Sequence, residues 1–188
     1  MKIVHIQRRP PLDRFSIEGY FSTIRESISK VSNVELYVLP YISRGLWKRI
    51  ANIFAARRRQ KDVNHVTGDV NYVAIMLNGK RTILTILDCE VLNRSSGIRR
   101  AILKKLWYEL PCKLVAVVTV ISEETKRQLI SEIQIPADRI HVIPVSVSSR
   151  FQPIVRPFRS ECPRILQIGT KANKNVVRLA QALKGMTC

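Results

Sequence analysis

The sequence predicts an α/β fold in which an open parallel sheet carries helices on both faces. Short apolar runs rich in β-branched residues alternate along the chain with stretches in which apolar residues recur at helical spacing. Residues 114–121 are apolar almost without interruption, as in a strand that is covered on both faces. Strands and helices that alternate in this way are joined by right-handed crossovers and therefore build a parallel sheet.

Length and composition fit this fold class. The chain has 188 residues, of which 46% are hydrophobic and 24% charged, close to the average for folded domains. This composition argues against the disordered and fibrous classes. At about 150 residues per domain, we expect one domain and a remainder.

The chain begins with a strand, a helix and a second strand. Residues 3–6 are apolar and precede two prolines, which predicts a buried strand. Residues 16–29 have helical spacing, with Ser16 as the expected N-cap. Residues 34–39 are rich in strand formers. A second helix is predicted over residues 46–59, and we expect its apolar stripe to pack against the sheet: Leu46, Trp47, Ile50, Ile53 and Phe54.

Two further strands and a second basic helix follow. Residues 62–69 predict a weak strand that leads into a short helix through Met76. Residues 81–87 predict a clear strand that ends at Asp88. A basic amphipathic helix is predicted over residues 98–110, with an inward-facing stripe formed by Ile98, Ile102, Leu106 and Trp107.

The last part of this unit is predicted to be a strand, a helix and a strand. Residues 114–121 form the first of these strands. Ser122 then caps a helix whose first turn carries two glutamates, which are favourable near the positive end of the helix dipole. Residues 140–143 are the closing strand, and Pro144 ends it.

The character of the chain changes after this strand. We assign residues 1–147 to a first domain and residues 148–163, which contain three prolines, to a linker. Residues 164–168 then predict a strand, which leads through a loop containing Gly169 into a helix. Residues 164–188 are thus expected to be the first strand–helix unit of a second domain.

Four stretches together resemble glycosyltransferase family 4. They are residues 15–18, the segment Thr85-Ile86-Leu87-Asp88 (similar to a Thr-x-His-Asp pattern), residues 118–126 with 138–144, and residues 165–175 with the helix after them. The resemblance implies the GT-B architecture, in which two Rossmann-like domains flank a cleft. It also implies retaining transfer of a sugar from a nucleotide-sugar donor to a glycan or lipid-linked acceptor in that cleft.

The chain departs from the family pattern at two places. Leu87 stands where the family has a histidine before Asp88, and Val145-Ser146 stands where Asn-Gly follows the hinge proline. A family member would also continue for roughly another 100–200 residues of donor-binding domain. We therefore expect a fragment truncated after the start of that domain, and a non-catalytic remnant stays open as the alternative to an active enzyme.

The loop that opens the second domain is the expected site for the donor diphosphate. A helix N-terminus after a glycine-containing loop offers backbone N–H groups to an anion, and a neighbouring lysine adds a positive charge. Gly169 and Thr170 have this layout, and Lys174 matches the family lysine that contacts the diphosphate. From spacing alone, an ordinary strand-to-helix turn with a solvated lysine is the favoured alternative.

The acceptor-side residues are expected at the carboxyl ends of the strands, where open α/β sheets bind ligands. We place six residues there: Arg8, Arg9, Ser16, Asp69, Asp88 and Ser122. Asp88 is the candidate catalytic residue, because it could orient an acceptor hydroxyl or accept its proton. A loop carboxylate that caps the following segment is an equally good interpretation of Asp88, and a plain helix cap is the better one of Ser122.

The sequence predicts neither a metal site nor a cofactor. The histidines and scattered acids have no metal-ligand spacing, and His5 and His65 are interpreted as core histidines. The four cysteines, at positions 89, 112, 162 and 188, contain no close pair, which predicts reduced thiols and a cytoplasmic protein. No secretory signal or membrane span is recognised.

The charge of the chain points to anionic partners. With 32 Lys and Arg against 14 Asp and Glu, the net charge is +18, which attracts nucleic acid, anionic lipid or phosphorylated substrates. A nucleic-acid-binding module is the alternative function, but aromatic residues are only 6% and no recognition motif accompanies the charge. Residues 44–61 and 94–105 carry seven and five basic residues, so these helices are candidates for peripheral contact with an anionic membrane. A solvated outer face is the slightly favoured alternative.

Overall fold

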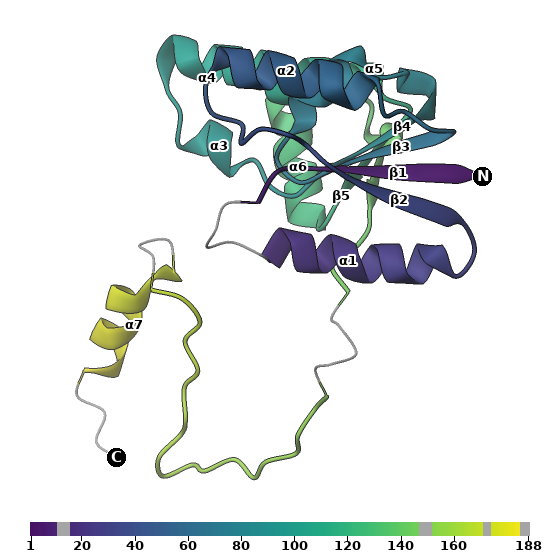
Figure 1. The fold of residues 1–188 in the computed structure, drawn as a ribbon. Helices are drawn as coiled ribbons and strands as arrows, with labels where there is room; N and C mark the ends of the chain where they lie inside the picture. The colour runs from purple at the N-terminus through teal and green to yellow at the C-terminus, as the bar shows by residue number, and fades with distance from the viewer. Residues whose placement is uncertain (11–15, 147–151, 171–173, 185–188) are drawn as a thin grey trace. The chain divides into compact units, whose positions relative to one another are not determined.

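The computed structural model describes residues 1–10, 16–146, 152–170 and 174–184. The chain divides into two compact units, Met1–Ser148 and Ser149–Cys188. In the described part of unit 1, six strands alternate with helices (Figure 1). No helix in the described ranges is long and apolar enough to cross a bilayer.

The elements of unit 1 follow the predicted order. The strands are β1 Lys2–Gln7, β2 Asn33–Val38, β3 Val63–Thr67, β4 Thr82–Ile86, β5 Val117–Val120 and β6 Ile140–Val142. The α-helices are α1 Ser16–Ser29, α2 Leu46–Arg57, α3 Glu90–Asn93, α4 Gly97–Leu103, α5 Leu110–Leu114 and α6 Glu123–Glu132. Shorter helical segments are η1 Asn71–Met76, η2 Gly79–Arg81 and η4 Ala137–Arg139, which are 3₁₀ turns, and the π-helical η3 Lys104–Glu109.

The strands form one parallel sheet in the order β2-β1-β3-β4-β5-β6. Helices α2, α4 and α5 lie on one side of it and α1 on the other (Figure 1). The predicted parallel α/β sheet with helices on both faces is therefore confirmed. The chain runs from β1 outward to β2 and then returns to β3 on the other side of β1, so the topological switch point lies between β1 and β3.

The core lies on both faces of the central strands. Val4 and Ile6 of β1, Val66 of β3, Leu84 of β4 and Val118 of β5 are completely buried. Continuous apolar runs thus became central strands, because both of their faces lose contact with water. The edge strand β2 is more exposed, which agrees with its mixed sequence.

The packing predicted for the two basic helices is wrong for most residues of the stripes, although Ile53 packs against the core as predicted. Leu46, Trp47 and Phe54 of α2 point to solvent, and so do Ile98 and Ile102 of α4. Leu106 in η3 is also exposed, whereas Trp107 is partly buried as expected. The residues that α2 buries are Asn52 and Ala56.

The segment η1 explains this reversal. Its residues Tyr72, Val73 and Ala74 are buried and contact both the sheet and α2, so η1 lies where the apolar stripe of a helix would otherwise pack. Asn52 fixes α2 on this support: its side-chain amide donates to the carbonyl of Tyr41 and to the Tyr72 hydroxyl at 2.8 and 3.1 Å. The fully buried residues of α2 are therefore small or polar, Ile53 packs against the core while half-buried, and Leu46, Trp47 and Phe54 remain outside.

Two boundaries also differ from the prediction. The helix expected over residues 98–110 runs as α4, η3 and α5 from Gly97 to Leu114, so Leu114 ends a helix instead of starting a strand. In unit 2, residues 164–168 are extended and exposed but form no strand, because no other strand lies among the described residues of unit 2 to pair with them. Helix α7, Val176–Leu183, is present as predicted.

Candidate active site

Three charged side chains meet at the switch point of the sheet. Arg8 follows β1, and its Nε donates to Oε1 of Glu18 on α1 at 2.8 Å. Its Nη1 donates to Oδ2 of Asp69, which follows β3, at 3.1 Å. The side chains of Arg8 and Glu18 are only 11% and 13% exposed, whereas Asp69 is 58% exposed. The cluster thus has a nearly buried ion pair, Arg8 with Glu18, and a second carboxylate, Asp69, that is open to solvent.

The electrostatics of the cluster keep Arg8 charged. Burial alone lowers the pKa of its guanidinium, but the hydrogen bonds that it donates to Glu18 and Asp69, together with the negative charges of these two carboxylates, outweigh burial and raise the pKa. The second carboxylate oxygen of Glu18, Oε2, is buried and accepts no hydrogen bond from the described residues. Such an oxygen has unused capacity to accept a hydrogen bond from a ligand hydroxyl.

The π-helical segment η3 ties the neighbouring loops together. Trp107 Nε1 donates to the carbonyl oxygen of Asp69 at 3.2 Å, and the Tyr108 hydroxyl donates to the carbonyl oxygen of Asp88 at 3.3 Å. Adjacent residues of one helix therefore hold the loops after β3 and β4. The sequence analysis missed Glu18 and Tyr108 as site residues. Glu18 lies within helix α1 and does not follow a strand, and helical spacing did not reveal the π-helical turn that places Tyr108 at these loops.

Asp88 and Ser122 follow β4 and β5 and make the local bonds of capping residues. Asp88 is exposed, and its Oδ1 accepts from the backbone N–H of Glu90 at 3.0 Å. Ser122 Oγ accepts from the backbone N–H of Thr125 at 3.1 Å, as the plain helix cap requires. Thr125 also donates to the carbonyl oxygen of Leu87 at 3.3 Å, which holds the start of α6 beside Asp88.

Replacement of Ser122 by alanine is expected to reduce the free energy of unfolding by about 1 kcal/mol, because a backbone N–H at the start of α6 loses its acceptor. Urea unfolding followed by circular dichroism measures this change. Ser131→Ala on the same helix is the control: its hydroxyl donates to the carbonyl of Gln128 on an exposed surface, and its loss is expected to have little effect. Equal losses for both variants would contradict the capping role.

The remaining predicted acceptor-side residues do not join the cluster. Arg9 is exposed, and its Nη1 donates to the carbonyl of Pro40 at 2.8 Å. Ser16 is the first residue of α1, and its side chain lies outside the described parts of the structure. Among the predicted residues, Arg8 and Asp69 are the pair in direct contact.

The residues around these loops were also searched for a reactive thiol and for a group of metal ligands. Burial, together with the charges of Asp88 and Glu132, raises the pKa of Cys89 to about 11, so this thiol is protonated at neutral pH. In the described ranges, no three His, Cys, Asp or Glu side chains are grouped as metal ligands.

The predicted diphosphate-binding residues lie next to one another in unit 2. Gly169 has a φ of +85°, and a Cβ placed on it would lie 3.3 Å from Cγ of Lys174. The lysine stem therefore lies over the glycine, which has no side chain to displace it. Gly169, Thr170 and Lys174 are exposed, and α7 begins two residues after Lys174. Residues 171–173 lie outside the described parts.

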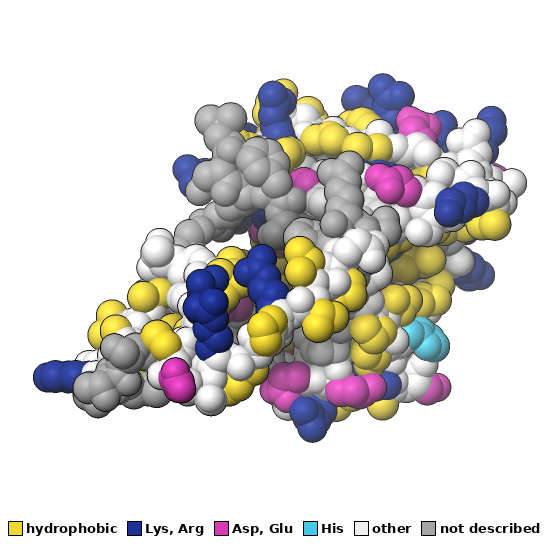
Figure 2. Space-filling model, turned by 90° about the horizontal axis from the view of Figure 1, so that it is seen from below, with side chains coloured by type: hydrophobic (Ala, Val, Ile, Leu, Met, Phe, Trp, Pro, Cys, Tyr) yellow, Lys and Arg dark blue, Asp and Glu magenta, His cyan; other side chains and the backbone are white. Residues whose placement is uncertain are grey.

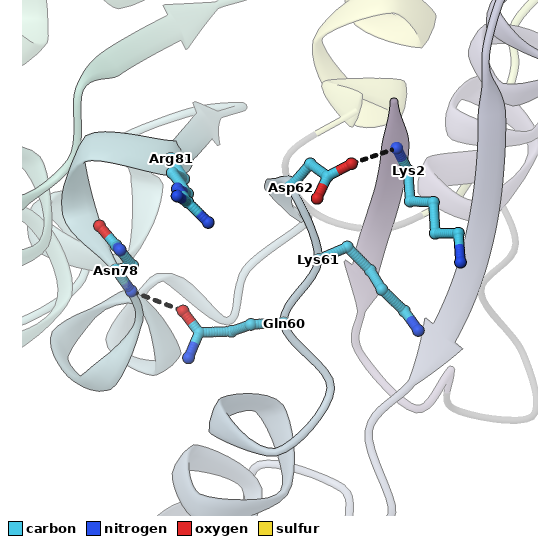
Figure 3. A pocket seen from close by; sticks show the side chains of 6 residues that line it. All are labelled: Lys2, Gln60, Lys61, Asp62, Asn78 and Arg81. Atoms are coloured by element: carbon cyan, nitrogen blue, oxygen red, sulfur yellow. Dashed lines mark hydrogen bonds between the residues drawn. The ribbon is translucent and has the colours of Figure 1, made fainter.

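A pocket also lies at the opposite edge of the sheet, where the strands begin (Figure 3). Lys2, Gln60, Lys61, Asp62, Asn78 and Arg81 line it. The backbone N–H of Lys2 donates to Asp62 Oδ2 at 2.8 Å, and that of Asn78 donates to Gln60 Oε1 at 2.6 Å. Parallel α/β sheets bind ligands at the carboxyl edge, so this pocket is not the candidate site.

The family model described as Glycosyltransferase Family 4 matches residues 7–150 of the chain. The matched region begins at the end of β1 and includes Arg8, Glu18, Asp69 and Asp88. No curated protein matches the chain.

Proposed function

Because the chain belongs to glycosyltransferase family 4, we propose that it serves the transfer of a sugar from a nucleotide-sugar donor to a glycan or lipid-linked acceptor. The observation that carries this proposal is the charged cluster at the switch point, which lies inside the region that the family model matches. We further propose a retaining reaction, on the basis of the family resemblance. A cytoplasmic location is proposed because the four cysteines contain no closely spaced pair in the sequence.

The acceptor is proposed to bind at the carboxyl edge of β1, β3 and β4. Glu18 Oε2 would accept a hydrogen bond from an acceptor hydroxyl, which would satisfy this buried oxygen. Arg8 would hold Glu18 in place, and Asp69 offers a second, exposed carboxylate. Asp88 is the proposed group that orients the attacking hydroxyl or accepts its proton.

The donor diphosphate is proposed to bind at Gly169, Thr170 and Lys174. Negative charge develops on the nucleoside diphosphate as it leaves, and fixed positive groups stabilise that charge. Lys174 would supply an ammonium group, and the N-terminus of α7 would supply backbone N–H groups. The proposed arrangement needs no metal or other cofactor.

Binding of nucleoside diphosphates to the full chain tests the donor part. Titration calorimetry with UDP, GDP and ADP is expected to identify one nucleotide that binds, and Lys174→Ala is expected to weaken its binding about tenfold. Lys184→Ala is the matched control, because Lys184 is exposed at the opposite end of the same helix, where the dipole repels anions. Equal effects of the two variants, or no binding at all, would contradict the proposed donor site.

A further inference from the structure

The pocket where the strands begin is lined entirely by polar and charged side chains. We call it the amino-edge pocket, and its lining residues are Lys2, Gln60, Lys61, Asp62, Asn78 and Arg81. Its volume is about 460 Å³, within the range of about 300–1,000 Å³ that small-molecule sites have. A water molecule takes up about 30 Å³, so the pocket has room for far more than a single ion. Its lining includes no aromatic ring on which a nucleobase could stack, so a compact polar ligand fits it best.

The lining of the pocket carries an excess of two positive charges, because three of its residues are basic and one, Asp62, is acidic. Figure 3 shows Arg81 on one side of the pocket and Lys2 and Lys61 on the other, with Asp62 between them. By contrast, acidic side chains lie among the basic ones on the face shown in Figure 2. Lys61 Nζ lies 3.3 Å from Glu35 Oε2, whereas the exposed side chains of Lys2 and Arg81 form no ion pair with the described residues. Two bases of the pocket are therefore available to an anion.

Buried polar side chains hold the walls of the pocket in place. Asn64 and Thr82 are completely buried and lie opposite each other on β3 and β4. Asn64 Oδ1 accepts from the backbone N–H of Lys61 at 3.0 Å, and Thr82 Oγ1 donates to the carbonyl of Asn78 at 2.8 Å. Gln60 Oε1, which accepts from the backbone N–H of Asn78, joins the segments that precede β3 and β4. A pocket that is already fixed in this way loses little conformational entropy when a ligand binds.

Asp62 places a hydrogen-bond acceptor among these bases. Its Oδ2 accepts from the backbone N–H of Lys2 at 2.8 Å, and its Oδ1 accepts no hydrogen bond from the described residues. An ionised carboxylate only accepts, so its partner on a ligand must be a donor such as a hydroxyl or an ammonium group. The positive excess of the lining repels an ammonium group, which favours a hydroxyl.

We propose that the amino-edge pocket binds a small phosphorylated polyol, a compound of the sugar-phosphate class. A phosphate monoester carries a charge of about −1.5 to −2 at pH 7, which matches the positive excess of the lining. The guanidinium of Arg81 can contact two phosphate oxygens at once, and the ammonium of Lys2 adds a second positive charge. The hydroxyls at the other end of the ligand donate to Asp62. The pocket lies at the edge of the sheet opposite the charged cluster, so this site is separate from the proposed acceptor site.

Titration calorimetry of the full chain tests this proposal without any enzymatic readout. Glucose 6-phosphate is expected to bind, inorganic phosphate to bind more weakly, and glucose to show no binding. Lys2→Gln and Arg81→Gln are each expected to weaken the binding of glucose 6-phosphate about tenfold. Arg99→Gln is the matched control: Arg99 is exposed on α4 without an ion pair to the described residues, so this variant loses the same charge away from the pocket and should bind normally.

A variant of the acidic residue tests the contact with the hydroxyls. Asp62→Asn removes the negative charge and keeps a side-chain oxygen that can accept from the backbone N–H of Lys2. Inorganic phosphate is expected to bind this variant more tightly, because a repulsive charge is lost. The preference for glucose 6-phosphate over inorganic phosphate is expected to fall about fivefold, because hydrogen bonds to charged acceptors are the stronger ones.

Three results would overturn the proposal. Equal losses of binding in Arg81→Gln and Arg99→Gln would show that the overall charge of the chain attracts the phosphate. Equal binding of glucose 6-phosphate and inorganic phosphate by the wild type would show that the hydroxyls are not recognised. Loss of glucose 6-phosphate binding in Lys174→Ala would place the ligand at the proposed donor site instead. Binding of glucose 6-phosphate that depends on Arg81 supports this inference whether or not any nucleoside diphosphate binds, so the two proposals fail separately.

Discussion

Acidification is expected to lower the free energy of unfolding of unit 1 strongly. This loss begins at a pH well above that at which carboxylates titrate. Burial lowers the pKa of His5 to about 4, with a smaller contribution from the charge of Arg25. Burial, together with the neighbouring His5, lowers the pKa of His65 to about 3. Both histidines are therefore neutral in the folded protein at pH values where the unfolded chain, with a pKa of about 6.5, binds a proton.

The sign of the effect follows from this difference. Above about pH 6.5 neither state binds the protons, and stability is complete. Below about pH 6.5 the two histidines of the unfolded chain bind protons, whereas those of the folded chain stay neutral. The free energy of unfolding therefore falls as the pH falls towards the pKa values of the folded protein. With two histidines the slope is about 2.7 kcal/mol per pH unit. Urea unfolding measured between about pH 6 and pH 5 isolates this slope from the carboxylates.

The geometry of the two histidines explains why protonation of either ring is unfavourable in the folded protein. His5 and His65 are directly opposite each other on β1 and β3, and their ring nitrogens are 3.3 Å apart. His65 Nε2 also lies 2.7 Å from the hydroxyl of Thr85, which in turn lies 2.7 Å from that of Thr119. A proton on either ring would be placed beside the other ring on a largely buried face of the sheet.

Histidine variants separate this effect from general acid unfolding. His5→Gln should halve the slope between pH 6 and pH 5, because one titrating group is removed. His141→Gln is the control: His141 lies on the exposed side of β6, so its replacement should leave the slope unchanged. A wild-type stability that is flat from about pH 7 to pH 5 would show that the pair is protonated or solvated in the folded protein.

The sheet could be predicted from the sequence because strands that are buried on both faces consist of continuous apolar residues. Strands β1, β4 and β5 are nearly continuous runs of apolar and β-branched residues, and each was predicted within a few residues of its bounds. The same reasoning failed for α2, whose amphipathic pattern indicates a helix but not which of its faces is covered. The inner face was decided by η1, which comes after α2 and β3 in the sequence and packs between α2 and the sheet.

The candidate site was predictable only in part for a related reason. Arg8 and Asp69 were placed at the carboxyl edge because each directly follows a predicted strand, and the structure brings them into contact. Glu18 lies within a helix and Tyr108 within a π-helical turn, and neither position follows from the rule that ligands bind beyond strand ends. Their roles depend on the contacts between elements, which local spacing does not encode.

Replacement of Gly79 by alanine is expected to be among the most damaging single changes in unit 1. A Cβ on Gly79 would lie 1.8 Å from the carbonyl oxygen of Leu114 and 2.9 Å from its carbonyl carbon. Both atoms belong to the backbone at the end of α5, so no side chain can rotate away to make room. The backbone N–H of Ala116 also donates to the carbonyl of Gly79 at 2.8 Å, which fixes the approach just before β5 begins.

The alanine must therefore push apart the starts of β4 and β5, which pair in the centre of the sheet. We expect a loss of about 3 kcal/mol in the free energy of unfolding, measured by urea unfolding. Gly19→Ala is the control of opposite sign: Gly19 lies within α1 with nothing within 4 Å of its added Cβ, so alanine should stabilise by about 0.5–1 kcal/mol through helix propensity. If Gly79→Ala stabilised the protein as Gly19→Ala is expected to do, the close approach between residues 79 and 114 would be wrong. The connection from α5 to β5 would then also differ from the one described here.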